Sequence, residues 1–391
     1  MKKILDIKPE IANGTGGMKW PEVQLQDVLT LEYGRALRED TRDSSGDIPV
    51  AGSNGIVGRH SESLVDGPGI VVGRKGSAGK VTWFSNNFWP IDTTYYVKPK
   101  AVCSFRWVYY LLNCLQLDRL STVTGVPGLN RNDAYKQKFA LPPISEQRRI
   151  VEILDQADAL RKKRAEANAK AARILPALFY KMFGDPATKP KGLDKKKLGE
   201  LIKVRSGNFL PAKNMDPEGQ YPVYGGNGIN GYHSEYMFEQ PVIVLGRVGA
   251  YCGTIYYSEP NCWVTDNALY VAEQSDDLHP RYLTEALRVA NLNQYAGRAG
   301  QPLISGSRIY PVEILIPPPE DQETFAISIV NLHRDENRRK DADDHIQKLF
   351  FVLLHRAFTG DLTAKWRETH MKELLAEMEQ QGKLLALENI E

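Results

Sequence analysis

The sequence predicts an α+β protein in which one globular unit occurs twice and each copy is followed by a long helix. A shift of 173 residues superposes 49–62 (PVAGSNGIVGRHSE) on 222–235 (PVYGGNGINGYHSE), with ten of the fourteen positions identical. Apolar residues recur at alternating spacings of three and four along 145–183, which is typical of a coiled-coil helix. Short apolar runs bounded by Gly, Asn and Pro lie on both sides of that helix and are typical of strands.

The repeat extends over most of the chain. GRKG (73–76) aligns with GRVG (246–249), and ALPPISEQ (140–147) aligns with LIPPPEDQ (315–322). Glycines, prolines and apolar positions are kept, whereas residues between them change, as at Lys75, which aligns with Val248. One scaffold with two different surfaces suits a protein that reads two different targets.

Each copy is predicted to be rich in strands. The expected strands are 70–72, 81–84 and 94–97 in the first copy and 242–245, 254–257 and 269–271 in the second, and the expected helices are 105–118 and 280–293. Asn54-Gly55 and Asn227-Gly228 predict tight turns, since Gly adopts positive φ at little cost.

The domain boundaries follow from this pattern. We expect a first domain at 1–144 with a loose lead-in at 1–19, a long helix at 145–183, a second domain at 184–319 that begins with a Pro/Gly/Lys-rich linker at 184–197, a second long helix at 320–360, and a helical tail at 361–391.

Ser145 is the expected N-cap of the first long helix, Gly184 follows its end, and Pro176 should bend its last turns. The helices should be antiparallel, because the second domain begins where the first helix ends and ends where the second helix begins. Pairing 150 with 358 places Arg164 opposite Asp344 and Arg173 opposite Asp335. We therefore expect an antiparallel two-helix coiled coil between two globular domains related by a pseudo-twofold axis.

The coiled-coil seam is expected at apolar or small residues. They are Ile150, Ile153, Ala157, Leu160, Ala167, Ala171, Ile174 and Leu178 in the first helix, and Phe325, Ile329, Leu332, Ala342, Ile346, Leu349 and Leu353 in the second.

Composition is that of an ordinary globular protein, with 42% hydrophobic and 25% charged residues. The apolar runs are too short to cross a bilayer and no leader is recognised, so a cytoplasmic protein without a membrane partner is expected. Four cysteines show no zinc-ligand spacing and are expected to be buried thiols. Residues 1–144 carry 18 basic and 14 acidic side chains, which fits an anionic partner.

The sequence contains no recognised catalytic, nucleotide-binding or metal-binding motif. The glycines from Gly73 to Gly79, followed by Lys80, miss the phosphate-loop spacing, so a Gly-rich hairpin is favoured. His60 recurs as His233, and a structural hydrogen bond is favoured over catalysis. We find no N/D-P-P-Y/F, Walker, H-E-x-x-H or clustered acidic nuclease motif, and expect no catalytic, cofactor or metal residue in this chain.

Cationic and polar side chains in or beside the predicted loops are the candidates for contact with DNA, since they supply the donors and acceptors that base edges and phosphates require. They are Arg35, Arg59, His60, Arg74, Lys75, Lys80, Asn130 and Arg131 in the first copy, and Arg205, Lys213, Tyr232, His233, Arg247, Arg298, Gln301 and Arg308 in the second.

The chain resembles the specificity subunit of type I restriction-modification systems. The resemblance rests on W-P-x-x-x-L-x-D-V (20–28), P-P-x-x-E-Q-x-x-I (142–150), its copy at 317–325, LPALFYKMFGD (175–185) and AFTGDLTAKWRE (357–368). The second copy departs at Asp321, where the first has Glu146.

The resemblance implies a non-catalytic subunit in which each domain reads one half of a split double-stranded DNA target, while the coiled coil sets the gap and docks two modification (methyltransferase) subunits. These partners would hold S-adenosylmethionine, and restriction subunits would use ATP and Mg. Two alternatives remain open: an orphan or regulatory DNA-binding scaffold, and a methyltransferase with an unrecognised active site.

Overall fold

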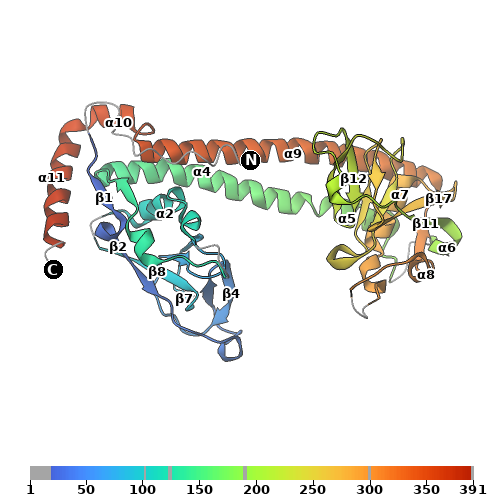
Figure 1. Cartoon of the computed structure of the whole chain (residues 1–391), viewed down its shortest axis with the longest axis horizontal. Coiled ribbons are helices and arrows are strands. Elements are labelled where there is room, and N and C mark those ends of the chain that lie inside the picture. Colours follow the sequence, from blue (N-terminus) through green and yellow to red (C-terminus); the bar gives the residue numbers. More distant parts are fainter. Residues whose placement is uncertain (1–18, 101–102, 122–125, 188–191, 298–300, 389–391) are drawn as a thin grey trace. The chain divides into compact units, whose positions relative to one another are not determined.

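The computed structural model describes residues 19–100, 103–121, 126–187, 192–297 and 301–388. The chain divides into two compact units (Figure 1). The first unit comprises Met1–Arg164 and Asp343–Glu391, and the second comprises Ala165–Ala342. Each unit thus contains one copy of the globular repeat together with parts of both long helices.

The globular part of the first unit is built on two small sheets. Its elements are β1 (Glu22–Gln24), α1 (Leu25–Val28), β2 (Leu29–Tyr33), η2 (Glu39–Thr41), β3 (Ile48–Gly52), β4 (Gly55–His60), β5 (Gly69–Gly73), β6 (Val81–Phe84), β7 (Trp89–Pro90), β8 (Thr94–Pro99), α2 (Phe105–Cys114), η3 (Leu117–Leu120), α3 (Arg131–Tyr135) and β9 (Lys138–Ala140). One sheet has the order β2-β8-β5-β6, the other has the order β4-β3-β7, and β1 pairs with β9.

The second unit repeats this topology. Its elements are β10 (Asp194–Lys197), α6 (Leu198–Leu201), β11 (Ile202–Ser206), η4 (Ala212–Asn214), β12 (Tyr221–Gly225), β13 (Gly228–His233), β14 (Ile243–Gly246), η5 (Gly249–Tyr251), β15 (Ile255–Tyr257), β16 (Trp263–Val264), β17 (Ala268–Gln274), α7 (Pro280–Val289), η6 (Leu292–Tyr295), α8 (Gly306–Ile309) and β18 (Glu313–Ile316). The sheet orders β11-β17-β14-β15 and β13-β12-β16 match those of the first unit strand for strand.

These elements confirm the predicted duplication. All six predicted strands are present. The helices predicted over 105–118 and 280–293 are shorter, because the α-helix ends at Cys114 or Val289 and a short 3-10 helix follows. The two Asn-Gly turns join β3 to β4 and β12 to β13, with positive φ at Gly55 and Gly228. Part of the expected linker is a strand, because 194–197 pairs with 313–316 just as β1 pairs with β9.

The long helices are α4 (Ile144–Ala171), α5 (Ile174–Phe183) and α9 (Pro319–Thr359), and the tail forms α10 (Ala364–Thr369) and α11 (Met371–Glu388). The single helix predicted over 145–183 is therefore two helices. Pro176 has no N–H to donate to the carbonyl of Ala172 and its ring crowds that carbonyl, so the helix breaks at Ala172 and Arg173. Gly184 terminates α5 with a φ of 83°, as predicted.

Ser145 does not cap α4, which begins one residue earlier at Ile144. Its N–H and hydroxyl instead donate to the Glu377 carboxylate of α11, at 3.0 and 2.5 Å. A carboxylate from the tail thereby satisfies a backbone donor at the positive end of α4, the role expected of a cap.

The helices pair in the antiparallel sense within each unit, as predicted. In the first unit the guanidinium of Arg164 on α4 donates to Asp343 on α9 at 2.7 Å, one residue away from the predicted partner Asp344. In the second unit the rings of Phe179 and Phe183, near the end of α5, meet Phe325 near the start of α9 at 5.7 and 5.2 Å. Asp335 forms an ion pair with Arg338 rather than the predicted one with Arg173.

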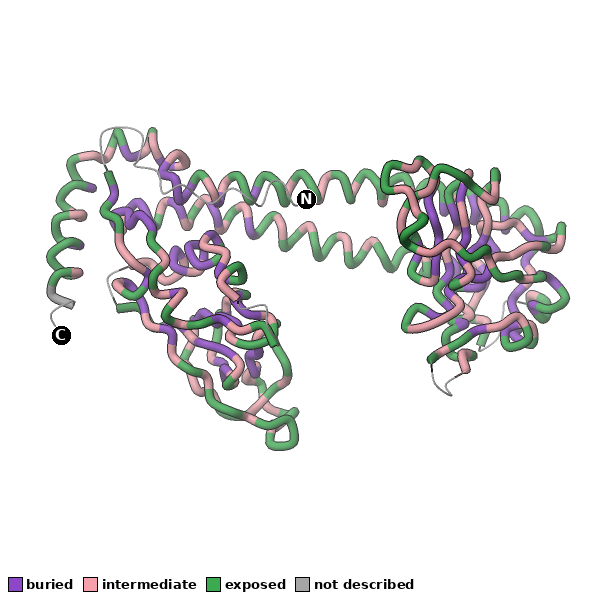
Figure 2. Tube along the Cα trace, in the orientation of Figure 1, coloured by how far each residue is buried: buried purple, intermediate pink, exposed green. Residues whose placement is uncertain are grey.

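The predicted seam needs correction at several positions (Figure 2). Leu160, Ile174 and Leu349 are 64%, 45% and 59% exposed, and Ala167 is also exposed. Leu154, Phe350 and Leu354 are buried instead. Each is the residue directly after a predicted seam residue, so the buried stripe is displaced by one residue over these turns. Ile150, Phe325 and Ile329 are buried as predicted, while Ile153, Ala157, Ala171, Leu178, Leu332, Ala342, Ile346 and Leu353 are partly buried.

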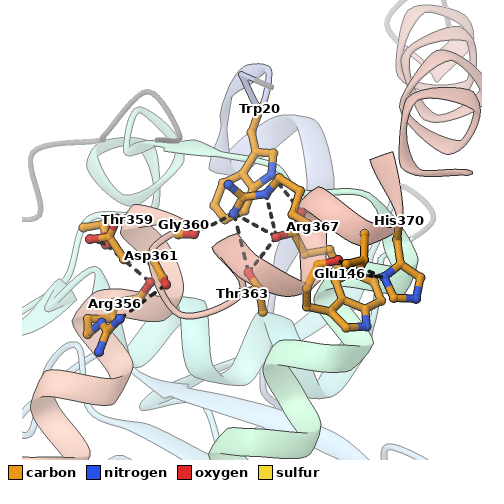
Figure 3. A network of polar contacts seen from close by, with 11 residues as sticks. Trp20, Glu146, Arg356, Thr359, Gly360, Asp361, Thr363, Arg367 and His370 are labelled. Carbon is orange, nitrogen blue, oxygen red and sulfur yellow. Dashed lines mark hydrogen bonds and ion pairs between the residues drawn. The ribbon is translucent and has the colours of Figure 1, made fainter. Parts of the chain in front are cut away.

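A buried polar network joins the two ends of the first unit's chain (Figure 3). The Glu146 carboxylate accepts from Trp20 Nε1 at 3.0 Å, from the Thr363 hydroxyl at 2.6 Å and from Arg367 Nε at 2.9 Å. Arg367 also donates to the Gly360 carbonyl at 2.6 Å and lies over the Trp20 ring at 4.7 Å. The segment before β1, the start of α4 and the segment after α9 are thereby held together.

Candidate nucleic-acid interface

A tight turn after the first sheet strand places an aromatic ring on the surface. β2 ends at Tyr33, and a Cβ on the following Gly34 would lie 2.2 Å from the carbonyl oxygen of Ile91. Only glycine allows this approach, which lets the Arg35 N–H donate to the Pro90 carbonyl at 2.9 Å. The Tyr33 side chain remains 50% exposed.

Two arginines lie against that ring. The guanidinium carbons of Arg74, after β5, and Arg131, at the start of α3, are 4.9 and 5.1 Å from the Tyr33 ring centroid. Arg74 Nη1 donates to the Asp92 carbonyl at 2.8 Å, and Arg131 Nη1 donates to the Leu31 carbonyl at 3.3 Å. Both cations are therefore held at the surface by a ring and a backbone acceptor.

The second unit repeats one of these arginines. Gly207 makes the same close approach, to the carbonyl oxygen of Val264. Arg247 Nη1 donates to the Asp266 carbonyl at 3.2 Å and to the Ser206 hydroxyl at 3.0 Å. Ser206 occupies the position of Tyr33 in the first copy, so the arginine is shared while the group beside it differs.

Other predicted residues of the first copy lie near this site. Asn130 accepts from the N–H of Asn132 and caps α3, and the backbone of Lys75 pairs with Gly128. Lys80 Nζ donates to the Asn54 carbonyl and side chain at 2.9 and 2.7 Å. This contact joins the β5–β6 hairpin to the β3–β4 turn, so 73–80 is a Gly-rich hairpin, as favoured from the sequence. Arg35 lies over the Trp89 ring at 6.0 Å.

The repeated histidines pack on the repeated tryptophans. His60 and Trp89, and likewise His233 and Trp263, meet edge to face at 5.5 Å. His60 Nδ1 accepts from the Asp43 N–H at 3.2 Å, which is the structural hydrogen bond favoured from the sequence. His233 Nδ1 is buried and has no such partner among the described residues, so the expectation holds for the first copy only. Nearby on the same strands, Arg59 faces Asp47 at 4.0 Å, and Tyr232 is 46% exposed.

The remaining candidates of the second copy are dispersed. Arg205 pairs with Glu273 at 3.3 Å, and Lys203 together with Arg205 holds the pKa of Glu273 below its ordinary value. Lys213 is exposed on η4, and the Gln301 side chain lies beside Gly249. Arg308 lies against Gly297 and lines a surface hollow with Lys195 and Tyr295. Arg298 falls outside the described residues.

Some surface residues of this region were missed. Tyr33 at the end of β2, Val126 before α3 and Phe209 after β11 are large side chains that are 50%, 71% and 74% exposed. An exposed aromatic beside arginine is a feature of nucleic-acid surfaces, because bases and guanidinium groups both stack on rings. A search that weighed Tyr33-Gly34-Arg35 as a unit could have found Tyr33.

The described residues show few features suited to covalent or metal chemistry. All four cysteines are free thiols, and burial raises the pKa of Cys114 to about 12, which keeps it protonated at neutral pH. Among the residues described, no cluster of three or more His, Cys, Asp or Glu is arranged to hold a metal ion. Within the same ranges, no helix combines the length and apolar character needed to cross a bilayer.

Comparison with known proteins identifies the family. The family described as the type I restriction modification DNA specificity domain matches twice, over residues 18–169 and 190–341. The two matches together cover more than half of the chain, and they coincide with the two copies of the repeat. The chain belongs to this family.

One relative and two solved structures are similar to this chain. The specificity subunit of the Escherichia coli type I restriction enzyme EcoprrI is 30% identical over 132 residues, a third of this chain and a third of the length of that protein. A crystal structure of the S subunit of a type I restriction-modification system from M. genitalium has a TM-score of 0.60 at 16% identity, covering 88% of this chain and 97% of that one. A structure from work on complex assembly and conformational transition of the type I R-M system has a TM-score of 0.51 at 17% identity, over 88% and 98%.

Proposed function

We propose that this chain is the DNA-specificity subunit of a type I restriction-modification complex and that each globular domain reads one half of an asymmetric, two-part target. One observation carries the proposal: the two units share a fold and an arginine held on a backbone carbonyl, yet differ in the side chains around it. A common scaffold with different surface groups is what reading two different sequences on one duplex requires.

The surface chemistry supports DNA as the ligand. Arg74 and Arg247, just after β5 and β14, and Arg131, at the start of α3, present cations beside polar and aromatic groups. Phosphate contacts from such cations supply affinity, and contacts to base edges supply specificity. Two copies of one domain in a single chain supply two reading surfaces for successive parts of one duplex.

Exposed apolar side chains on the long helices support protein partners. In the first unit Leu160 on α4 and Leu349 and Val352 on α9 are 64%, 59% and 51% exposed, and in the second unit Tyr180 on α5 and Ile327 on α9 are 44% and 55% exposed. Leu349 and Val352 lie one turn apart on α9, and neighbouring exposed apolar side chains of this kind are typical of interaction surfaces. We assign one such surface in each unit to a modification subunit, with S-adenosylmethionine, ATP and Mg bound by partners and the chemistry done there.

A deletion in the paired helices tests the proposal. Removing 164–170 from α4 together with 337–343 from α9 deletes one heptad from each helix and takes out Arg164 with its partner Asp343. Seven residues correspond to about 10 Å of helix, or about three base pairs. We expect the methylated target to keep both half-sites and lose about three base pairs of the gap between them.

The measurement is methylation-sensitive sequencing of a host that carries the variant with its partners. A control that exchanges Arg164 and Asp343 keeps the helix length and should leave the gap unchanged. A change in half-site sequence upon deletion would contradict the assignment of reading to the domains and spacing to the helices.

A further inference from the structure

Three arginines of the interface share one geometry. A backbone carbonyl accepts from Nη1 of Arg74, Arg131 and Arg247 at 2.8, 3.3 and 3.2 Å. The edge formed by Nε and Nη2 makes no hydrogen bond within the described residues in any of the three. Such an edge presents two parallel N–H donors, which match either O6 and N7 of guanine or two oxygens of a phosphate.

Comparison of the two copies separates these possibilities. The DNA backbone has the same chemistry at every site, so both domains can use one residue to contact it, whereas residues that read different bases must differ. Arg74 and Arg247 occupy the same position, and each is held by the carbonyl of the repeated aspartate, Asp92 or Asp266. Arg131, in contrast, aligns with Gly306 and belongs to the first copy alone.

The Tyr33 ring holds Arg131 in place. It lies 5.1 Å from the Arg131 guanidinium carbon, and Tyr135 faces the same carbon at 5.8 Å. The Tyr33 ring in turn packs on the Tyr95 ring, with 5.2 Å between the ring centroids. The Tyr95 hydroxyl donates to the Leu129 carbonyl at 3.2 Å. A guanidinium that packs against two rings loses less rotamer freedom on binding, and its direction is set before the ligand arrives.

We propose that Arg131 is a guanine-reading residue of the first domain, that Tyr33 is its positioning residue, and that Arg74 and Arg247 are phosphate contacts common to both domains. This inference rests on the proposed function and assigns base reading and backbone contact to separate arginines of one site. It requires a guanine in the first half-site whose major-groove edge meets the Nε–Nη2 edge of Arg131.

The test uses the full chain with its co-purifying partners, duplexes that carry single base-pair changes in the first half-site, and methylation-sensitive sequencing in the host. The unaltered chain should lose about ten- to a hundredfold in affinity when the guanine pair is replaced. Arg131→Ala and Arg131→Lys should both abolish discrimination for guanine at that one position and leave recognition of the second half-site unchanged. Lysine keeps the charge but lacks the two parallel N–H donors of the guanidinium, so it should not rescue discrimination.

The phosphate contacts should respond differently. Arg74→Ala and Arg247→Ala should weaken binding to all sequences alike, leave the methylated target unchanged, and reduce the slope of log affinity against log salt by about one. Lys136→Ala removes an exposed cation just after α3 that faces Asp133 at 3.9 Å, and it serves as the matched control that changes neither property.

Positioning by Tyr33 has its own readout. Tyr33→Phe keeps the ring and should keep guanine discrimination, whereas Tyr33→Ser, which introduces the residue of the second copy, should lose it at unchanged thermal stability. Uniform weakening by Arg131→Lys with an unchanged target, or relaxation in the second half-site, would overturn the inference. Absence of any two-part target for the unaltered chain would instead contradict the proposed function.

Discussion

Arg367→Ala is expected to lower the free energy of unfolding of the first unit by about 3–5 kcal/mol, because it leaves a buried carboxylate without its cation. The Glu146 and Arg367 side chains are 0% and 1% exposed, and Nη2 lies 2.8 Å from the carboxylate. Trp20 and Thr363 would still donate to Glu146, but neither carries a charge. The variant should also loosen the attachment of the tail, because Arg367 holds the Gly360 carbonyl (Figure 3).

Urea unfolding followed by tryptophan fluorescence measures this effect. The tryptophans at positions 20, 83, 89, 107 and 366 lie in the first unit, and Trp263 alone lies in the second, so the signal reports chiefly on the first unit. Lys365 is an exposed cation on the same helix as Arg367, so Lys365→Ala is the matched control within the first unit, with an expected change of about 0.5 kcal/mol or less. A loss below about 1 kcal/mol for Arg367→Ala would show that the network does not secure the unit.

Phe325→Ala is expected to destabilise the second unit by about 3–5 kcal/mol, the usual range for removing a buried ring. Phe325 is fully buried and meets Phe179, Phe183 and Tyr282 at 5.7, 5.2 and 6.3 Å. These rings join the end of α5 and the start of α9 to α7. Loss of the Phe325 ring would leave a cavity where α5 and α9 attach to the second domain.

Hydrogen exchange resolved by peptide measures this second effect. Amides of α5 and α7 should exchange faster in Phe325→Ala, since exchange in a stable unit follows its opening free energy. Ile327→Ala, two residues further along the same helix at a side chain 55% exposed, is the control and should leave those amides unchanged. Equal acceleration in both variants would contradict a role for the aromatic cluster.

The duplication and the strands could be predicted from sequence because their signals are local. Turn residues such as Asn54-Gly55 fix backbone angles within a few positions, and comparison of the copies reinforces each apolar run. The coiled-coil stripe could not be placed over 349–354, because all six residues there are apolar and periodicity is lost. Burial of Phe350 and Leu354 rather than Leu349 is decided by α2 and α4 packing against α9.

The buried network could not be predicted for a different reason. Trp20 and Arg367 meet Glu146 across sequence separations of 126 and 221 residues, and no local pattern marks such a contact. At the interface the sequence indicated Arg74, Arg131 and Arg247 as cations in turns, but not which of them stack or which carbonyls hold them. Tyr33 carries no charge, and its counterpart Ser206 has no ring, so no local pattern marks Tyr33 as a neighbour of these arginines.

The central claim is that the two copies read two different halves of one DNA target, and the methylated motif of a host carrying this chain and its partners tests it most directly. The account predicts two unlike specific half-sites separated by a fixed number of unspecified base pairs. A single contiguous motif, or one whose halves are identical, would contradict it.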